Sequence, residues 1–417
     1  PFLFDHGQVQ GQAGGRLAGQ GGHEGHAEGV DPIEGRLAIQ LWPAERANSV
    51  EIRSSRPVTA SQLFVGKPAE CAVQTIPLLF NICGNAQLVT ANRAIESSRE
   101  TPASDACEEW REALLHLETL REQLWRILLE WPKMSDYKPD TTSLARFNQE
   151  LNRLIELLRR DPDISGLGAG EPRVRIDMNH WQRLSAAIEQ ALFAGQAQKW
   201  LELSGICSLE EWCDRQRSLP ADLIRDIFDK RWHSLGFSDY QPLKQSLDAD
   251  VHEKLLSDDA GQFIRQPSLQ DFCLETGPLA RHDEHPLVEE LLGLYGNGLL
   301  ARVVARLVDI AVSLVRLGEF FSGSARLPFR RAGDGIATVE AARGRLTHKV
   351  SIESDRILDY RILAPTEWNF HPAGVVARGL ASLRATNPEI LRQQAAMLIH
   401  AVDPCVGYDL SVGEADA

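Results

Sequence analysis

The spacing of hydrophobic residues predicts a mainly helical protein built from long amphipathic helices. Residues 107–131, CEEWREALLHLETLREQLWRILLEW, carry Trp or Leu at nearly every third or fourth position, the period of a helix with one buried face. The same period recurs in further predicted helices, at 71–98, 144–160, 177–196 and 387–402.

The most apolar stretch, GLLARVVARLVDIAVSLVRLGEFF at 298–321, also predicts a helix. It contains Arg302, Arg306, Asp309 and Arg316. These charges are too costly for the centre of a bilayer. We therefore expect a buried helix whose charges find partners or water, and no membrane span.

Alternation of apolar and polar residues predicts strands at 34–41 and 49–54, and again at 337–353 and 355–363, where a tight acidic turn joins the two. The predicted class is α+β and mainly helical. We expect a long-helix bundle with small peripheral β-sheets near its two ends, and buried helices at 107–131 and 298–321.

Residues 1–29 are rich in Gly, Gln and His and predict a disordered, solvated tail. The chain begins with Pro, so a mis-called start is an alternative for this segment. We expect residues 30–412 to form a single domain, followed by a short tail at 413–417.

Composition narrows the function classes. Hydrophobic content of 43% and charged content of 24% are those of an ordinary soluble globular protein. The formal net charge of −14 argues against nucleic acid as a partner, because no basic excess exists to displace counterions from phosphates. Seven scattered cysteines do not suggest a disulfide framework. No signal peptide is visible, and a cytoplasmic location fits best.

Two polar features inside the predicted core have ordinary interpretations. His116 lies among leucines of the 107–131 helix and is expected to be a hydrogen-bonded core histidine. RHDEHP at 281–286 clusters two histidines with two acids, for which a solvated turn is favoured over a metal site.

Cys83 and Cys405 have the settings that best suit chemistry. Cys83 precedes a glycine at a break in a helical pattern, and Cys405 follows Asp-Pro just past a predicted helix end. Such breaks can expose a thiolate. Two thiolates alone make a poor permanent metal site, because zinc and iron–sulfur clusters take four ligands.

The DPC stretch at 403–405 resembles the C-terminal Cys-x-x-Cys-x-x-His motif of the large subunits of nickel–iron hydrogenases, which follows Asp-Pro. Other stretches resemble that family in the same order along the chain: VDPIEGRL (30–37), NICGNAQLVT (81–90), ETGPLAR (275–281), and EAARGRLTHKVSI (340–352) followed by APTEWNF (364–370). The resemblance spans residues 30–412 and implies a large-subunit-like fold in which the two cysteine loops meet at the centre.

The resemblance also implies what has been lost. In the family, two cysteines bind nickel terminally and two bridge nickel and iron. By motif position, Cys83 and Cys405 match the terminal pair. The family's two bridging cysteines and two histidines are replaced by Ala86, Tyr408, Thr90 and Ser411. Alanine has no donor, and a phenol does not readily replace a soft bridging thiolate. No complete nickel–iron centre is expected.

Other family positions survive. Glu34 matches a proton-relay glutamate, Arg343 matches the arginine over the diatomic ligands of the iron, and Asp403 and Pro404 match the residues before the third cysteine. Guanidinium donors suit cyanide nitrogens.

The pattern resembles the degenerate accessory branch of the family, the hydrogenase expression/formation proteins. It implies a non-catalytic maturation protein that transiently holds the Fe(CN)2CO fragment between Cys83 and Cys405. The partners expected are the hydrogenase large-subunit precursor and the iron-fragment maturation proteins.

Three alternatives stay open at this point. The protein could be a metal-free chaperone or docking platform that mimics the large subunit. It could be an active hydrogenase with an altered site, which predicts nickel and hydrogen turnover. A generic zinc or redox protein is a further class, against which the lack of any C-x-x-C pair argues.

Overall fold

The computed structural model describes residues 35–413, except 45, 136, 169, 259, 260 and 386. The predicted tail at 1–29 and Glu34 lie outside the described residues.

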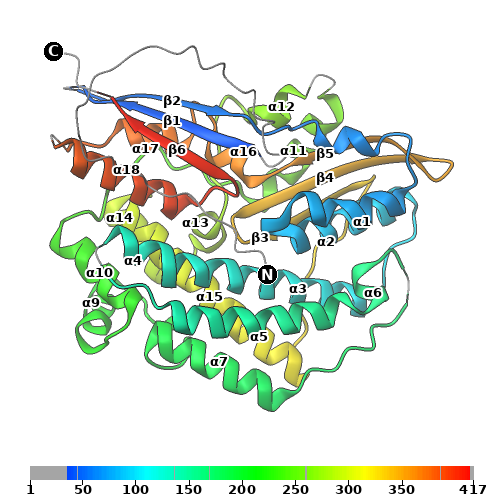
Figure 1. Cartoon of the computed structure of the whole chain (residues 1–417), viewed down its shortest axis with the longest axis horizontal. Helices are drawn as coiled ribbons and strands as arrows, with labels where there is room; N and C mark the ends of the chain where they lie inside the picture. The colour runs from blue at the N-terminus through cyan, green and yellow to red at the C-terminus, as the bar shows by residue number, and fades with distance from the viewer. Residues whose placement is uncertain are drawn as a thin grey trace, which may run out of the picture.

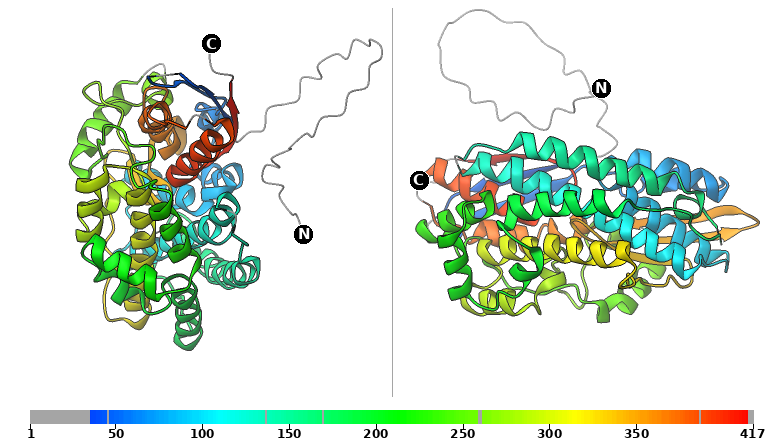
Figure 2. Two further views of the ribbon diagram at one scale, coloured as in Figure 1. Left: turned by 90° about the vertical axis from the view of Figure 1, so that its left-hand side faces the viewer. Right: turned by 90° about the horizontal axis from the view of Figure 1, so that it is seen from below.

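Long helices running along the longest axis form the body of the molecule (Figures 1 and 2). Helix α3 (Asp105–Trp125) continues through a π-helical turn, η3 (Arg126–Glu130), into α4 (Trp131–Met134). The hydroxyl of Ser104 caps α3 by accepting from the Cys107 amide at 3.2 Å. Helix α15 (Leu299–Ser322) packs against α3 and is buried along most of its length. Both long helices are thus confirmed.

Arg302, Arg306 and Asp309 of α15 are paired inside the protein, whereas Arg316 and Glu319 are exposed, in keeping with the prediction of partners or water. Arg302 contacts Glu275 at 3.0 Å, with 2% and 4% of the two side chains exposed. Asp309 accepts from Arg281 at 2.7 Å. The described part of the chain holds no helix with both the length and the apolar character needed to span a bilayer.

Two three-stranded sheets lie on the same side of the helical body, one toward each end of the longest axis (Figure 1). The first has the order β2-β1-β6, from β1 (Arg36–Trp42), β2 (Ser49–Ser54) and β6 (Gly407–Val412). Strand β1 is antiparallel to β2 and parallel to β6.

The second sheet has the order β3-β4-β5, from β3 (Ile336–Ala341), β4 (Gly344–Glu353) and β5 (Arg356–Leu363), all antiparallel. The acidic turn between β4 and β5 is confirmed: Ser354 and Asp355 both have positive φ, as a type I′ hairpin turn requires. The single strand predicted at 337–353 is wrong, because a hairpin turn at Ala342 and Arg343 divides it. Gly344, with φ of +130°, provides the backbone conformation of that turn.

The remaining elements cover the sheets and fill the space between them. Helix α2 (Gly84–Ser98) packs on β3 and β4, α17 (Val375–Ala381) on β2, and α18 (Pro388–Val402) on β6. The other helices of the described residues are η1 (Ala60–Phe64), α1 (Ala69–Leu79), η2 (Asn81–Cys83), α5 (Thr141–Arg159), α6 (Pro162–Ser165), α7 (Met178–Phe193), α8 (Ala197–Leu201), α9 (Ile206–Arg215), α10 (Leu219–Asp229), η4 (Gln245–Leu247), α11 (Asp248–Ser257), α12 (Gln262–Arg265), α13 (Pro278–His282), α14 (Pro286–Tyr295) and α16 (Pro365–Asn369).

Candidate metal-fragment site

The two cysteine loops meet, as predicted. Cys83 ends η2 and forms the N-cap of α2, and Cys405 follows α18 on the way into β6. The thiols lie near enough to interact electrostatically. Burial raises the pKa of the Cys83 thiol to about 12, and Cys405 and Glu118 add to the rise. Cys83 therefore carries its proton at neutral pH, and a metal that binds it displaces that proton.

Thr366 of α16 holds Cys405. Its Oγ1 lies 2.8 Å from the cysteine Sγ and accepts from the Cys405 amide at 3.3 Å. Both residues are buried, and only 9% of Cys405 is exposed. Pro404 is buried beside it. The second thiol is therefore fixed by a short helix that belongs to neither cysteine motif.

A chain of fully buried polar groups supports Cys83 from the other side. Gln87 Nε2 donates to the Cys83 sulfur at 3.6 Å, and Gln87 Oε1 accepts from His348 Nε2 at 2.9 Å. Because Nε2 then carries the hydrogen, Nδ1 accepts from the Tyr360 hydroxyl at 3.0 Å. Burial lowers the pKa of His348 to about 3, so the imidazole is neutral and can play both roles.

Glu118 of α3 anchors the loop of Cys83. Its carboxylate accepts from the backbone amides of Asn85 at 2.8 Å and Ala86 at 3.0 Å, in the first turn of α2. Glu118 therefore caps the N-terminus of α2, because the side chain of the N-cap residue, Cys83, accepts no hydrogen bond from the helix. Burial raises the pKa of Glu118, while Arg121 and the two amides oppose the rise.

Asp403 organises the turn before Cys405. The residue ends α18 in the left-handed region, with φ of +71°. Its carboxylate contacts Arg126 at 2.6 Å, Arg306 at 3.1 Å and Arg343 at 3.1 Å. Burial alone would raise the pKa of Asp403, but the three guanidinium groups hold it well below its usual range.

Arg343 lies at the tip of the β3–β4 hairpin and interacts with both thiols. Besides Asp403, it contacts Glu122 at 3.2 Å. Burial alone would lower its pKa, but Asp403, Glu122 and the two thiols raise it well above the usual range. A cation thus faces both sulfurs from this side.

Sequence reasoning missed a second cation, Arg56. It lies in the extended segment after β2 and donates through Nη1 to both carboxylate oxygens of Glu367, at 2.8 and 3.0 Å. Only 9% and 6% of the two side chains are exposed. Burial alone would lower the pKa of Arg56, but Glu367, Cys405 and Cys83 raise it well above the usual range. The one available signal was that Glu367 belongs to the APTEWNF stretch.

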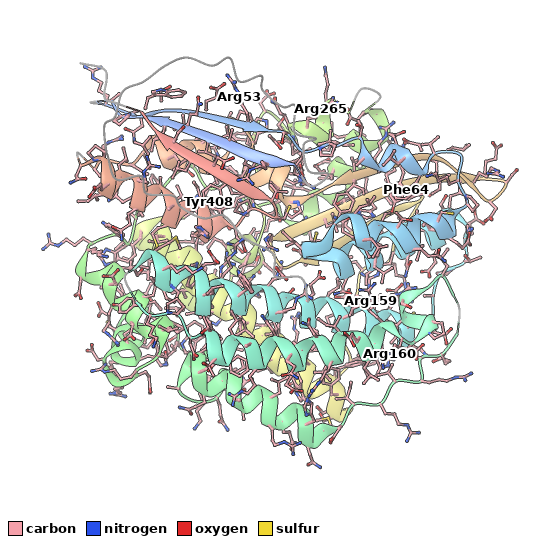
Figure 3. The ribbon with its side chains drawn as sticks, in the orientation of Figure 1. Arg53, Phe64, Arg159, Arg160, Arg265 and Tyr408 are labelled. Atoms are coloured by element: carbon pink, nitrogen blue, oxygen red, sulfur yellow. The ribbon has the colours of Figure 1, made fainter. Side chains whose placement is uncertain are left out.

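The positions of the lost family ligands have other partners. Ala86 is fully buried, and the Thr90 hydroxyl donates to the Ala86 carbonyl at 2.6 Å, inside α2. Tyr408 lies on β6 (Figure 3), its ring edge-on to His400 at 5.5 Å, and burial raises its pKa to about 12. Ser411 is exposed further along the same strand.

The remaining sequence candidates are structural. His116 Nδ1 lies 3.0 Å from the Ser313 hydroxyl, which confirms the core histidine. The predicted turn before Pro286 is present at 283–285, with Glu284 exposed, but Arg281 and His282 belong to α13 and reach the buried Asp309, at 2.7 and 2.8 Å. Throughout the described ranges, no group of three or more His, Cys, Asp or Glu residues could hold a metal ion.

Known proteins share both the sequence pattern and the fold. The profile of the nickel-dependent hydrogenase family matches residues 318–408, which include Arg343, Thr366, Glu367 and Cys405. The hydrogenase expression/formation protein HupK of Rhizobium leguminosarum bv. viciae is 33% identical over 88% of this chain and 94% of its own length. The hydrogenase expression/formation protein HoxV of Cupriavidus necator is 30% identical over 87% of this chain and 93% of its own.

Among solved structures, the Ni-Fe-Se hydrogenase of Desulfomicrobium baculatum matches with a TM-score of 0.60. The match covers 91% of this chain and 98% of the hydrogenase chain, at 15% sequence identity. This likeness establishes the fold, a large-subunit bundle, as predicted.

Proposed function

Because the chain belongs to the large-subunit family of nickel-dependent hydrogenases, in the branch of the hydrogenase expression/formation proteins, we propose that it is a non-catalytic maturation scaffold. Its cargo is the Fe(CN)2CO fragment, held between Cys83 and Cys405. Iron-fragment maturation proteins deliver the cargo in the cytoplasm, and the hydrogenase large-subunit precursor receives it.

One observation carries the proposal: two thiols far apart in the sequence meet beside buried arginines, and no third ligand joins them within the described residues. Permanent zinc and iron–sulfur sites take four protein ligands. A pair of thiols instead suits a fragment that brings its own ligands and later leaves. Arg343 provides guanidinium hydrogens, which match the nitrogen of a bound cyanide.

Infrared spectroscopy tests the proposal. The protein is purified after production together with the full set of iron-fragment maturation proteins. We expect cyanide and carbonyl stretching bands in the unaltered chain and their loss in Cys83→Ala and Cys405→Ala. Cys207→Ala is the matched control, because Cys207 is exposed and free. Absence of the bands from the unaltered chain contradicts carriage.

A metal-free docking platform is the second candidate. It is favoured by the fold match over 98% of a hydrogenase chain, which means that large-subunit surfaces can persist where the ligands do not. This function predicts that Cys83→Ala and Cys405→Ala support hydrogenase maturation as well as the unaltered chain. Carriage predicts that both variants fail.

A further inference from the structure

The thiol pair is flanked by cations on two sides. Among the described residues, Arg56 and Arg343 each interact electrostatically with both Cys83 and Cys405. They come from different parts of the fold, the segment after β2 and the tip of the β3–β4 hairpin.

Arg56 is held in place at its backbone and at its head group. Gly35, with φ of +69°, lets the two backbones meet closely: a Cβ at Gly35 would lie 2.5 Å from the Arg56 Cα. At the other end, Glu367 binds the guanidinium, and its neighbour Thr366 binds the Cys405 sulfur at 2.8 Å. Adjacent residues of α16 therefore fix the position of the cation relative to the thiol.

We propose that Arg56, fixed by Glu367, acts with Arg343 as a charge filter that admits iron carrying cyanide and rejects bare divalent metal ions. This inference rests on the proposed function and names the property of the cargo that the site selects.

Charge counting gives the physical reason. Iron(II) with two cyanides and one carbon monoxide is neutral, so two bound thiolates give the complex a charge of −2. Five arginines lie around the thiols and the turns that carry them: Arg56, Arg121, Arg126, Arg306 and Arg343. Their carboxyl partners are Glu118, Glu122, Glu367 and Asp403, so the cations exceed the anions by one. That excess favours a complex of charge −2 and opposes a bare divalent ion, which already neutralises the two thiolates.

Titration of the apo-protein with Co2+ tests the filter, with thiolate-to-cobalt charge-transfer absorption as the readout. We expect Arg56→Gln to bind Co2+ about tenfold or more tightly than the unaltered chain, because one repelling charge is gone. Arg56→Lys keeps the charge and should bind Co2+ as weakly as the unaltered chain. Glu367→Gln removes the counter-charge and should weaken Co2+ binding further.

The two variants should change Co2+ affinity in opposite directions: Arg56→Gln should raise it and Glu367→Gln should lower it. A structural loosening of the pocket would instead change Co2+ affinity in the same direction in both variants. Arg93→Gln is the matched control, because Arg93 is also held by carboxylates inside the protein, Glu108 and Glu112. Equal Co2+ affinity in Arg56→Gln and the unaltered chain overturns the filter. So does tighter binding in Glu367→Gln. These titrations need no cargo, so they stand apart from the infrared test of carriage.

Discussion

Thr366 contacts Cys405 at two atoms, the sulfur at 2.8 Å and the backbone nitrogen at 3.3 Å. One hydroxyl thus fixes both the thiol and the loop that carries it. Thr366→Val keeps the shape of the side chain and removes both contacts. Because a buried N–H then lacks an acceptor, we expect a loss of about 1–3 kcal/mol in the free energy of unfolding. Urea denaturation measures it. Thr366→Ser keeps the hydroxyl and should lose less, and equal losses would contradict this role.

Asp403 is the common counter-charge of three arginines. Asp403→Asn leaves buried guanidinium groups uncompensated, and we expect a loss of about 3–5 kcal/mol in the free energy of unfolding. Asp409 offers a matched control, because its ion pair with Arg36 is exposed, with 70% of the Asp409 side chain in solvent. Asp409→Asn should cost less than about 1 kcal/mol. Similar losses in the two variants would show that the Asp403 cluster is not important for stability.

His348 should make the protein sensitive to acid. Burial lowers its pKa from 6.5 to about 3 in the folded chain, so below pH 6.5 the unfolded chain binds a proton that the folded chain does not. Stability then falls as pH falls from 6.5 toward 3, by about 1.4 kcal/mol per pH unit from this residue. Urea denaturation at a series of pH values measures the slope. His348→Gln should lower that slope, and an unchanged slope would be evidence against a buried neutral imidazole.

Ala86 is three residues after Cys83 in the first turn of α2. Residues at this spacing lie on one face of a helix. Ala86→Cys should therefore add a third thiolate and raise Co2+ affinity by about tenfold or more. Ala91→Cys is the control, since Ala91 is equally buried but lies on a different face of α2. Gel filtration with a chelator, followed by metal analysis, gives a second readout. Equal metal retention in the two variants would mean that position 86 does not face the thiols.

The long helices and the meeting of the cysteine loops could be predicted because their signals are local or strongly patterned. The 298–321 stretch is dominated by Leu, Val and Ala, which is typical of a helix buried along most of its length. Arg343 could be predicted from the family motif, although the turn that carries it was placed inside a strand. The Arg-Gly pair at 343–344 was the missed signal.

Arg56 and β6 could not be predicted for a different reason. Arg56 is 311 residues from Glu367 in sequence, and no periodicity relates two single residues at that distance. Strand β6 is short, and its partner β1 lies at the other end of the chain. The contacts of Arg281 and His282 could not be predicted, because their buried partner, Asp309, lies on another helix.

The parallel pairing of β6 with β1 sets the order in which the site can form. Arg36 lies opposite Gly407, just beyond Cys405, and the pairing extends to Leu41 opposite Val412. Contacts so distant in sequence are costly to close and form late. On a ribosome, Cys83 and both arginines emerge well before Cys405. The second thiol is therefore synthesised after Cys83, Arg56 and Arg343, so the site cannot be completed until the residues that surround it have been made.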